Sequence, residues 1–179
     1  MKEFPIDKAY QFIEPGPVVL MTTSDKGKPN VMTMSWITCV DFVPQFVCIV
    51  SNGDYSFTAL RKNKECVIAI PTVDMMATVI DIGNCSGQDV NKFEKFSLTP
   101  LPAKKIKAPL ISECLANIEC RVIDDSMADK YNLFILEGVK AWINPTRKEK
   151  RMFHAGGDGT FIVDGDKVDM KKRMTKFDR

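Results

Sequence analysis

The sequence has a single histidine among its 179 residues, His154, and its six cysteines form no C-x-x-C pair. A hydrolase triad needs a histidine with a partner on each side, and a histidine metal site needs several imidazoles. Zinc sites of the finger type need paired cysteines. We therefore expect no metal centre and no hydrolytic triad, and no side chain is predicted to act as a catalytic acid or base.

Long apolar runs are also missing. None approaches the roughly 18 residues that span a bilayer. The first residues, "MKEFPIDKAYQFIEPGP", contain three acidic residues and lack the apolar region of a secretory signal. Most cysteines lie inside apolar runs, where a free thiol packs as a small hydrophobic group. These features predict reduced cysteines, no membrane association and a cytoplasmic location.

Charge gives little indication of a polyanionic partner. The net charge is only +2, and basic residues are spread along the chain. Only the end, "KVDMKKRMTKFDR", is rich in Lys and Arg, and we interpret it as a solvated tail. No interleaving of aromatic and basic residues typical of RNA-binding surfaces is present, so we expect no nucleic-acid partner.

The chain instead contains many short β-rich segments. Residues 18–23 and 30–40, separated by the turn "SDKGKP", predict a hairpin, and residues 45–51 and "ECVIAIP" predict further strands. "CLANIECRVID" and "YNLFILEGVKAWI" predict two long antiparallel strands. A final hairpin is predicted in "GTFIVDGDKV", with its turn at Asp164-Gly165.

Only two helices are predicted, a short one over "YSFTALRKN" with Asp54 as N-cap, and one over residues 73–83 that ends at Gly83. The proline-rich stretch 84–107 is expected to be mostly loop. Because helices do not alternate with strands, we predict a mainly β, antiparallel and nearly closed barrel in a single domain, 1–179.

Six stretches in this order resemble the flavin reductase-like family of FMN-binding split barrels, which includes the flavoredoxins. They are "PGPVVLMTTSDKGKPNVMTMSW", "YSFTALRKNKECVIAIP", "CSGQDVNKF", "ANIECRVID", "YNLFILEGVKAWINP" and "MFHAGGDGTFIVDG". They cover about residues 12–168, leaving a tail over 169–179. The resemblance implies a six-stranded Greek-key barrel, a homodimer, and FMN bound without a covalent bond near the dimer interface.

The resemblance also implies flavin contacts in the "CSGQDVNKF" loop, through Ser86, Gly87 and Lys92. A fixed ammonium favours binding of a phosphate or reduction of a flavin ring. A glycine lets backbone approach a ligand without a Cβ clash. Without the resemblance, the loop reads as an ordinary surface connection.

A second implied contact is the segment Asn30 to Trp36. The resemblance places Asn30, Thr33, Met34, Ser35 and Trp36 along the cofactor. Side chains alternate along a strand, so some of these residues must act through edge N–H and C=O groups. The alternative for Met34 and Trp36 is core packing.

The segment "SNGDYSF" is the phosphate candidate, because a helix N-terminus offers unpaired amides and Ser51 and Ser56 add hydroxyls. Relatives usually carry a basic residue where this chain has Asp54. A carboxylate there repels a phosphate unless it turns away as a cap. An ordinary capped surface helix is the alternative.

Three further contacts follow from partial matches: Tyr131, His154 and Phe161. Relatives often have histidine in place of Tyr131 and two adjacent histidines where this chain has His154 and Ala155. A phenol can bond a phosphate but does not titrate near neutral pH. Tyr131 can equally be a core or rim residue, His154 a structural one, and Phe161 a part of the barrel packing.

The resemblance implies an FMN-dependent oxidoreductase that takes electrons from NADH or NADPH. The acceptor would be free flavin, ferric iron or a redox partner protein. An electron-carrier flavoprotein of the flavoredoxin type, without NAD(P)H activity, is the main alternative. A split barrel that has lost FMN and binds haem or nothing is a third possibility.

Overall fold

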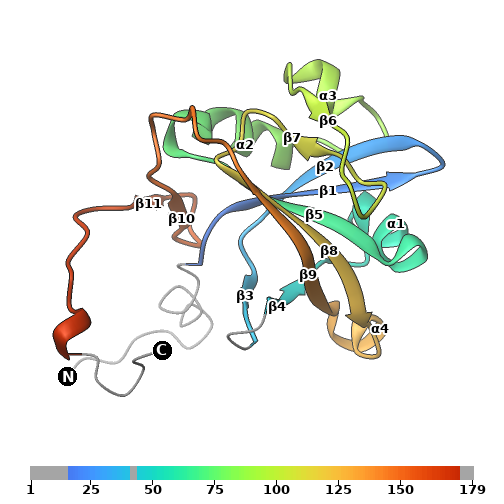
Figure 1. The fold of residues 1–179 in the computed structure, drawn as a ribbon. Helices are drawn as coiled ribbons and strands as arrows, with labels where there is room; N and C mark the ends of the chain where they lie inside the picture. Colours follow the sequence, from blue (N-terminus) through green and yellow to red (C-terminus); the bar gives the residue numbers. More distant parts are fainter. Residues whose placement is uncertain (1–15, 41–43, 174–179) are drawn as a thin grey trace.

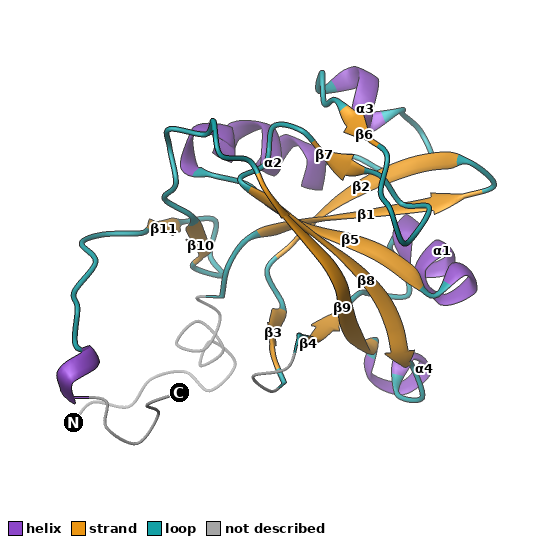
Figure 2. Ribbon diagram, in the orientation of Figure 1, coloured by secondary structure: helices purple, strands orange, loops and turns teal. Residues whose placement is uncertain are grey.

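The computed structural model describes residues 16–40 and 44–173. Their main element is a strongly curled seven-stranded sheet (Figures 1 and 2). Its strands, in spatial order, are β2 (Lys28–Met34), β1 (Val19–Asp25), β5 (Glu65–Ile70), β8 (Ala116–Asp124), β9 (Leu133–Ile143), β4 (Gln45–Ile49) and β3 (Ile37–Cys39). All neighbouring strands are antiparallel, which confirms the predicted mainly β, antiparallel class.

The predicted strand over residues 30–40 is wrong as a single element. Strand β2 ends at Met34 and β3 begins at Ile37, and the two lie at opposite ends of the sheet order. The Ile37 amide donates to the Ser35 carbonyl at 3.0 Å, and the Ile49 amide donates to the Trp36 carbonyl at 3.0 Å. This tight bend carries the chain from one sheet edge to the other. The sheet therefore has seven strands where six were predicted.

Alternating side chains give the sheet two apolar faces, as the period of a strand requires. In β1, Val19 and Met21 face one core, while Leu20 and the preceding Val18 face the other. The first core is completed by α1 (Tyr55–Asn63) and α4 (Ala128–Tyr131). The second is completed by α2 (Met76–Gly83), α3 (Lys92–Lys95) and β7 (Leu110–Ile111).

Both predicted helices are confirmed. Helix α1 begins after Asp54, and the second helix consists of a 3-10 turn, η2 (Val73–Met75), followed by α2. The stretch 84–107 is mostly loop, as predicted, but also contains α3 and the short strand β6 (Pro100–Leu101), which pairs with β7. Among the described residues, no helix is long and apolar enough to cross a membrane.

Two boundaries differ from prediction. Tyr131 ends α4 and does not open a strand, because Asn132 takes a left-handed conformation, φ 59°, before β9 begins. The last hairpin pairs β10 (Phe153–Ala155) with β11 (Phe161–Val163), so its turn lies at residues 156–160 and not at Asp164-Gly165. Gly157 and Gly159 supply the positive φ values that this turn needs.

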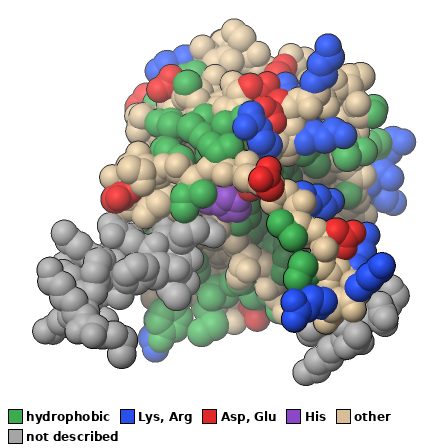
Figure 3. Space-filling view, turned by 90° about the vertical axis from the view of Figure 1, so that its left-hand side faces the viewer, with side chains coloured by type: hydrophobic (Ala, Val, Ile, Leu, Met, Phe, Trp, Pro, Cys, Tyr) green, Lys and Arg blue, Asp and Glu red, His purple; other side chains and the backbone are tan. Residues whose placement is uncertain are grey.

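The β10–β11 hairpin packs on the second core through Phe153 and, at its edge, Phe161. Figure 3 shows this side of the molecule, where the histidine lies near both hydrophobic and acidic side chains. After the hairpin, residues 165–173 are exposed and include η3 (Lys171–Arg173), in agreement with a solvated tail. Residues 12–15 of the predicted barrel and 174–179 of the tail lie outside the described residues.

All six cysteines are free, and Cys48, Cys66, Cys114 and Cys120 are buried. Burial raises the pKa of Cys48 and of Cys114 to about 12, so these thiols stay protonated near neutral pH. The four buried cysteines pack as small apolar groups, as the sequence predicted.

Candidate functional site

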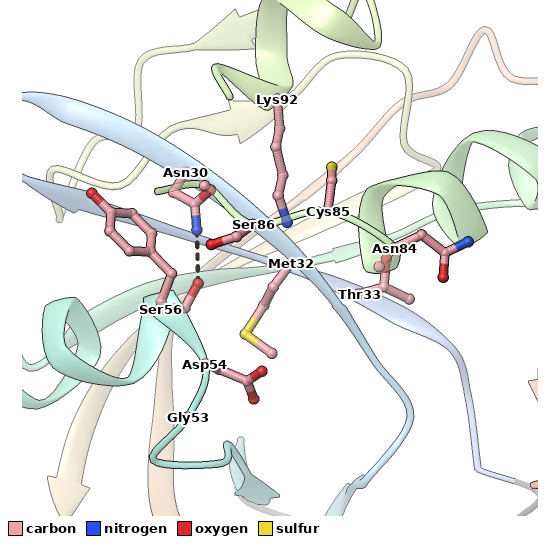
Figure 4. Close-up of a pocket in the computed structure, with 13 residues that line it drawn as sticks. Asn30, Met32, Thr33, Gly53, Asp54, Ser56, Asn84, Cys85, Ser86 and Lys92 are labelled. Atoms are coloured by element: carbon pink, nitrogen blue, oxygen red, sulfur yellow. Dashed lines mark hydrogen bonds between the residues drawn. The ribbon is translucent and has the colours of Figure 1, made fainter. Parts of the chain in front are cut away.

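A pocket of about 310 Å³ opens where β2, the N-terminus of α1, the loop after α2 and the start of α3 meet. Figure 4 shows its lining from these four segments. Six of the predicted site residues line it: Asn30, Thr33, Ser56, Ser86, Gly87 and Lys92. Segments that are far apart in the sequence thus converge on one cavity.

Lys92 is the cation of this pocket. It is the first residue of α3, whose N-cap Asn91 accepts a bond from the Glu94 amide and so fixes where the helix begins. Its side chain is only 5 % exposed, and Nζ donates to the Ile82 carbonyl at 2.9 Å. Burial lowers the pKa of Lys92, and the neighbouring Cys85 and Asp54 side chains partly oppose this shift. One bond to Ile82 uses one of the three donors of an ammonium.

Gly87 allows the loop to pack tightly against β2 and α1. A Cβ at this position would lie 2.0 Å from Asn30 Oδ1 and 2.9 Å from Tyr55 Cδ1. The absent side chain therefore makes room for Asn30, which donates from Nδ2 to Ser56 Oγ at 2.9 Å. Ser86 holds the turn, because its hydroxyl oxygen accepts from the Gln88 amide at 3.1 Å. Approach of the Gly87 backbone to a cofactor stays a prediction.

The five predicted residues of the segment 30–36 are separated by the structure. Asn30 and Thr33 line the pocket, and Thr33 Oγ1 donates to the Val79 carbonyl at 2.5 Å, which ties β2 to α2. Met34 packs in the first core, in agreement with the core-packing alternative. Ser35 and Trp36 form the bend between β2 and β3, outside the pocket lining, and Trp36 is 55 % exposed.

The two serines of the phosphate candidate differ in their position relative to α1 and the pocket. Ser56 is buried in the pocket. Ser51 lies outside the lining, and its hydroxyl oxygen accepts from the Gly53 amide at 3.3 Å. Asp54 is at the N-cap position without a side-chain cap bond. Its Oδ2 instead accepts from the Ser51 amide at 3.1 Å.

The remaining three predicted contacts lie away from this pocket. Tyr131 is half-exposed on α4, with the Lys130 ammonium 4.9 Å from its ring centre. His154 Nε2 is 2.9 Å from Asp164 Oδ1, and its buried Nδ1 has no hydrogen bond to a described residue. Phe161 packs edge-on against Phe153, with ring centres 5.9 Å apart. Within one chain, they are not brought together with Lys92.

Several lining residues were not predicted as contacts. Met32 lies two residues after Asn30 and so shares its strand face. The alternation of side chains along the strand could therefore have indicated Met32 as a lining residue. Asn84 and Cys85 directly precede the predicted Ser86, whereas no sequence pattern indicated Tyr55 as a partner of Gly87. In residues 16–40 and 44–173, no group of three His, Cys, Asp or Glu side chains is arranged to hold a metal ion.

Comparison with curated proteins finds relatives that include two archaeal proteins. A protein of Archaeoglobus fulgidus is 39 % identical over 111 residues, which are 62 % of this chain and 63 % of the relative. A protein of Pyrococcus abyssi is 30 % identical over 129 residues, 72 % of this chain and 74 % of the relative.

Solved structures share the fold. Flavoredoxin from Methanosarcina acetivorans superimposes with a TM-score of 0.81 at 23 % identity, over 98 % of both chains. An FMN-binding domain of a flavin reductases-like enzyme from Shewanella baltica gives 0.79 at 24 % identity, over 93 % of this chain and 95 % of that one. The likeness confirms the predicted split-barrel fold. The family model "Flavin reductase like domain" matches residues 13–160. The chain therefore belongs to the flavin reductase-like family.

Proposed function

We propose that the pocket binds FMN without a covalent bond and that the protein is an NAD(P)H-dependent flavin reductase-like oxidoreductase. The observation that carries this proposal is the buried Lys92 ammonium, which faces a cavity in a chain of the flavin reductase-like family. A buried cation is costly unless it has partners, and among the described residues the Ile82 carbonyl alone accepts a hydrogen bond from it. An anionic or electron-rich ligand would compensate the remaining cost.

The donor set fits a flavin. Strand β2 lies at one edge of the sheet. Its outer edge therefore offers backbone N–H and C=O groups beside the pocket. A flavin pyrimidine ring is an array of matching donors and acceptors. Ser56 and Ser86 add hydroxyls, and Gly83 and Gly87 bring backbone close to the cavity. With about 310 Å³, the pocket would enclose a part of the ligand and leave another part accessible.

When bound, FMN supplies the capacity to take two electrons from a nicotinamide and to pass them to an acceptor. The protein's own residues then need only to bind and orient the ring and to set its electrostatic environment. We assign the electrostatic role to Lys92, because a positive charge near the flavin ring favours the reduced state of the flavin. The acceptor in this proposal is free flavin, ferric iron or a redox protein.

A homodimer is part of the same proposal. Trp36 and Ile162, which are more than half exposed, are large apolar side chains on the bend before β3 and on β11. His154 and Phe161 also belong to the β10–β11 hairpin. A second copy packed on this surface would cover the apolar groups and bring the hairpin toward a pocket of its neighbour. The six free cysteines suit a reducing, cytoplasmic location.

The visible spectrum of the purified protein tests this function. A yellow protein whose colour is bleached by NADH or NADPH without oxygen supports the reductase. A yellow protein that only dithionite bleaches supports a carrier of the flavoredoxin type. The second candidate function is considered because a flavoredoxin shares the fold. A colourless protein that added FMN does not restore would contradict both functions.

A further inference from the structure

Asp54 places a negative charge at the position where the fold would otherwise attract an anion. It precedes the nine-residue helix α1, whose first turn contains no acidic residue. The first amides of such a helix lack intrahelical partners and carry a partial positive charge. A phosphate would bind well at this end of the pocket if no carboxylate were present.

The Asp54 carboxylate is held in place beside the pocket. Its Oδ2 accepts from the Ser51 amide at 3.1 Å, while its own amide donates to the Ser51 carbonyl at 2.9 Å. Its carbonyl accepts from the Phe57 amide at 3.0 Å, which closes the first turn of α1. The two backbone bonds fix the turn before α1, and the bond from the Ser51 amide holds the exposed Asp54 carboxylate at the pocket lining. The Asp54 carboxylate therefore offsets part of the positive charge at the N-terminus of α1.

The other charged group of the lining lies across the cavity. Figure 4 shows Lys92 entering from α3 on one side and Asp54 on the other, with Met32 between them. Lys92 already donates to the Ile82 carbonyl, and burial lowers its pKa. The pocket thus has a positive and a negative side, and the negative side coincides with the helix N-terminus.

We propose that Asp54 is a specificity-determining residue that selects against the phosphate of the bound flavin. This inference rests on the proposed flavin binding. Riboflavin and FMN share the ring and the ribityl chain, and they differ only in the phosphate. A carboxylate beside the α1 N-terminus weakens FMN binding through charge repulsion and leaves riboflavin binding nearly unaffected. The ratio of the two dissociation constants isolates this effect from any general change in the pocket.

The test compares Asp54→Asn with the wild type and with Asp81→Asn. Asparagine keeps an acceptor for the Ser51 amide and is also a favourable N-cap residue, so the local fold is preserved. Asp81 is exposed on α2 and does not line the pocket, so its variant makes the same change in net charge. Titrations of each apoprotein with FMN and with riboflavin, followed by quenching of flavin fluorescence, give both dissociation constants.

We expect Asp54→Asn to lower the ratio of the FMN constant to the riboflavin constant about tenfold, and Asp81→Asn to leave it unchanged. A tenfold change corresponds to about 1.4 kcal/mol. A ratio in Asp54→Asn within twofold of the wild-type ratio would overturn the inference, including the case in which both flavins bind more weakly by the same factor. If neither flavin binds the wild type, the proposed function itself fails and this inference fails with it.

Discussion

Replacing Lys92 by Met removes the ammonium from the pocket and keeps most of the side-chain volume. The stem of Lys92 is buried on α3, so truncation to Ala would also leave a cavity and confuse the result. Methionine is flexible and apolar and can fill the same space. The change therefore separates the charge of Lys92 from its packing.

The magnitude follows from what the ammonium does in the two states. Without ligand, Lys92 contributes one bond to the Ile82 carbonyl, and burial lowers its pKa, which shows that its charged form is disfavoured there. These effects oppose each other, so the free protein should change little in stability. With FMN bound, a charge-assisted hydrogen bond of about 1.5–3 kcal/mol is lost. The dissociation constant should therefore rise roughly 10- to 150-fold.

Fluorescence titration of the apoprotein with FMN measures this constant, and Lys95→Met is the matched control. Lys95 lies one turn further along α3 and is exposed, so its variant loses the same charge without changing the pocket lining. We expect Lys95→Met to bind FMN nearly as the wild type does. An affinity of Lys92→Met within twofold of the wild type would refute the assignment of Lys92 to the flavin.

Three further predictions concern the pocket loop and a buried carboxylate on β8. Gly87→Ala should break the Asn30 hydrogen bond to Ser56, because the new Cβ would lie 2.0 Å from Asn30 Oδ1. It should destabilise the apoprotein by about 1–3 kcal/mol in urea unfolding. Glu119→Gln should cost about 2–3 kcal/mol at pH 7, since a buried carboxylate with several donors is replaced by an amide. Cys85 should be alkylated in the apoprotein and protected by FMN.

The glycine and cysteine predictions each have a control. Gly165→Ala, whose Cβ would have no atom within 4 Å, should leave stability unchanged, and an equal loss in both glycine variants would contradict the packing argument. For the thiol, the exposed Cys39 should react with or without FMN. Equal reaction of Cys85 in both states would place the ligand elsewhere.

The effect of Glu119 should depend on pH. Burial alone would raise the pKa of Glu119, but hydrogen bonds from the Lys104 amide, the Trp142 indole and the Lys105 amide lower it overall. The unfolded chain therefore binds a proton at a higher pH than the folded chain does. The stabilisation is complete above the ordinary glutamate pKa and is lost as pH falls through the lowered folded value. The difference between wild type and Glu119→Gln should accordingly shrink in acid.

The sequence by itself determined the elements that depend on neighbouring residues. The β-rich composition of β1 and β5, Asp54 before α1 and the turn chemistry of residues 24–29 were sufficient to predict strands, a helix and the first hairpin. Ser86, Gly87 and Lys92 were predicted from their order in one loop, through a family resemblance. All three line the same pocket in the structure.

Tertiary structure decided the features that depend on residues far apart in the chain. Whether residues 30–40 form one strand depends on which edges β2 and β3 can pair with, and no local pattern encodes that choice. Gly87 is required by Asn30 and Tyr55, which are brought to it only by folding. The burial of Lys92 against Ile82 has the same origin, because charge and hydrogen bonding in a pocket depend on the distance and solvent exposure that the whole fold sets.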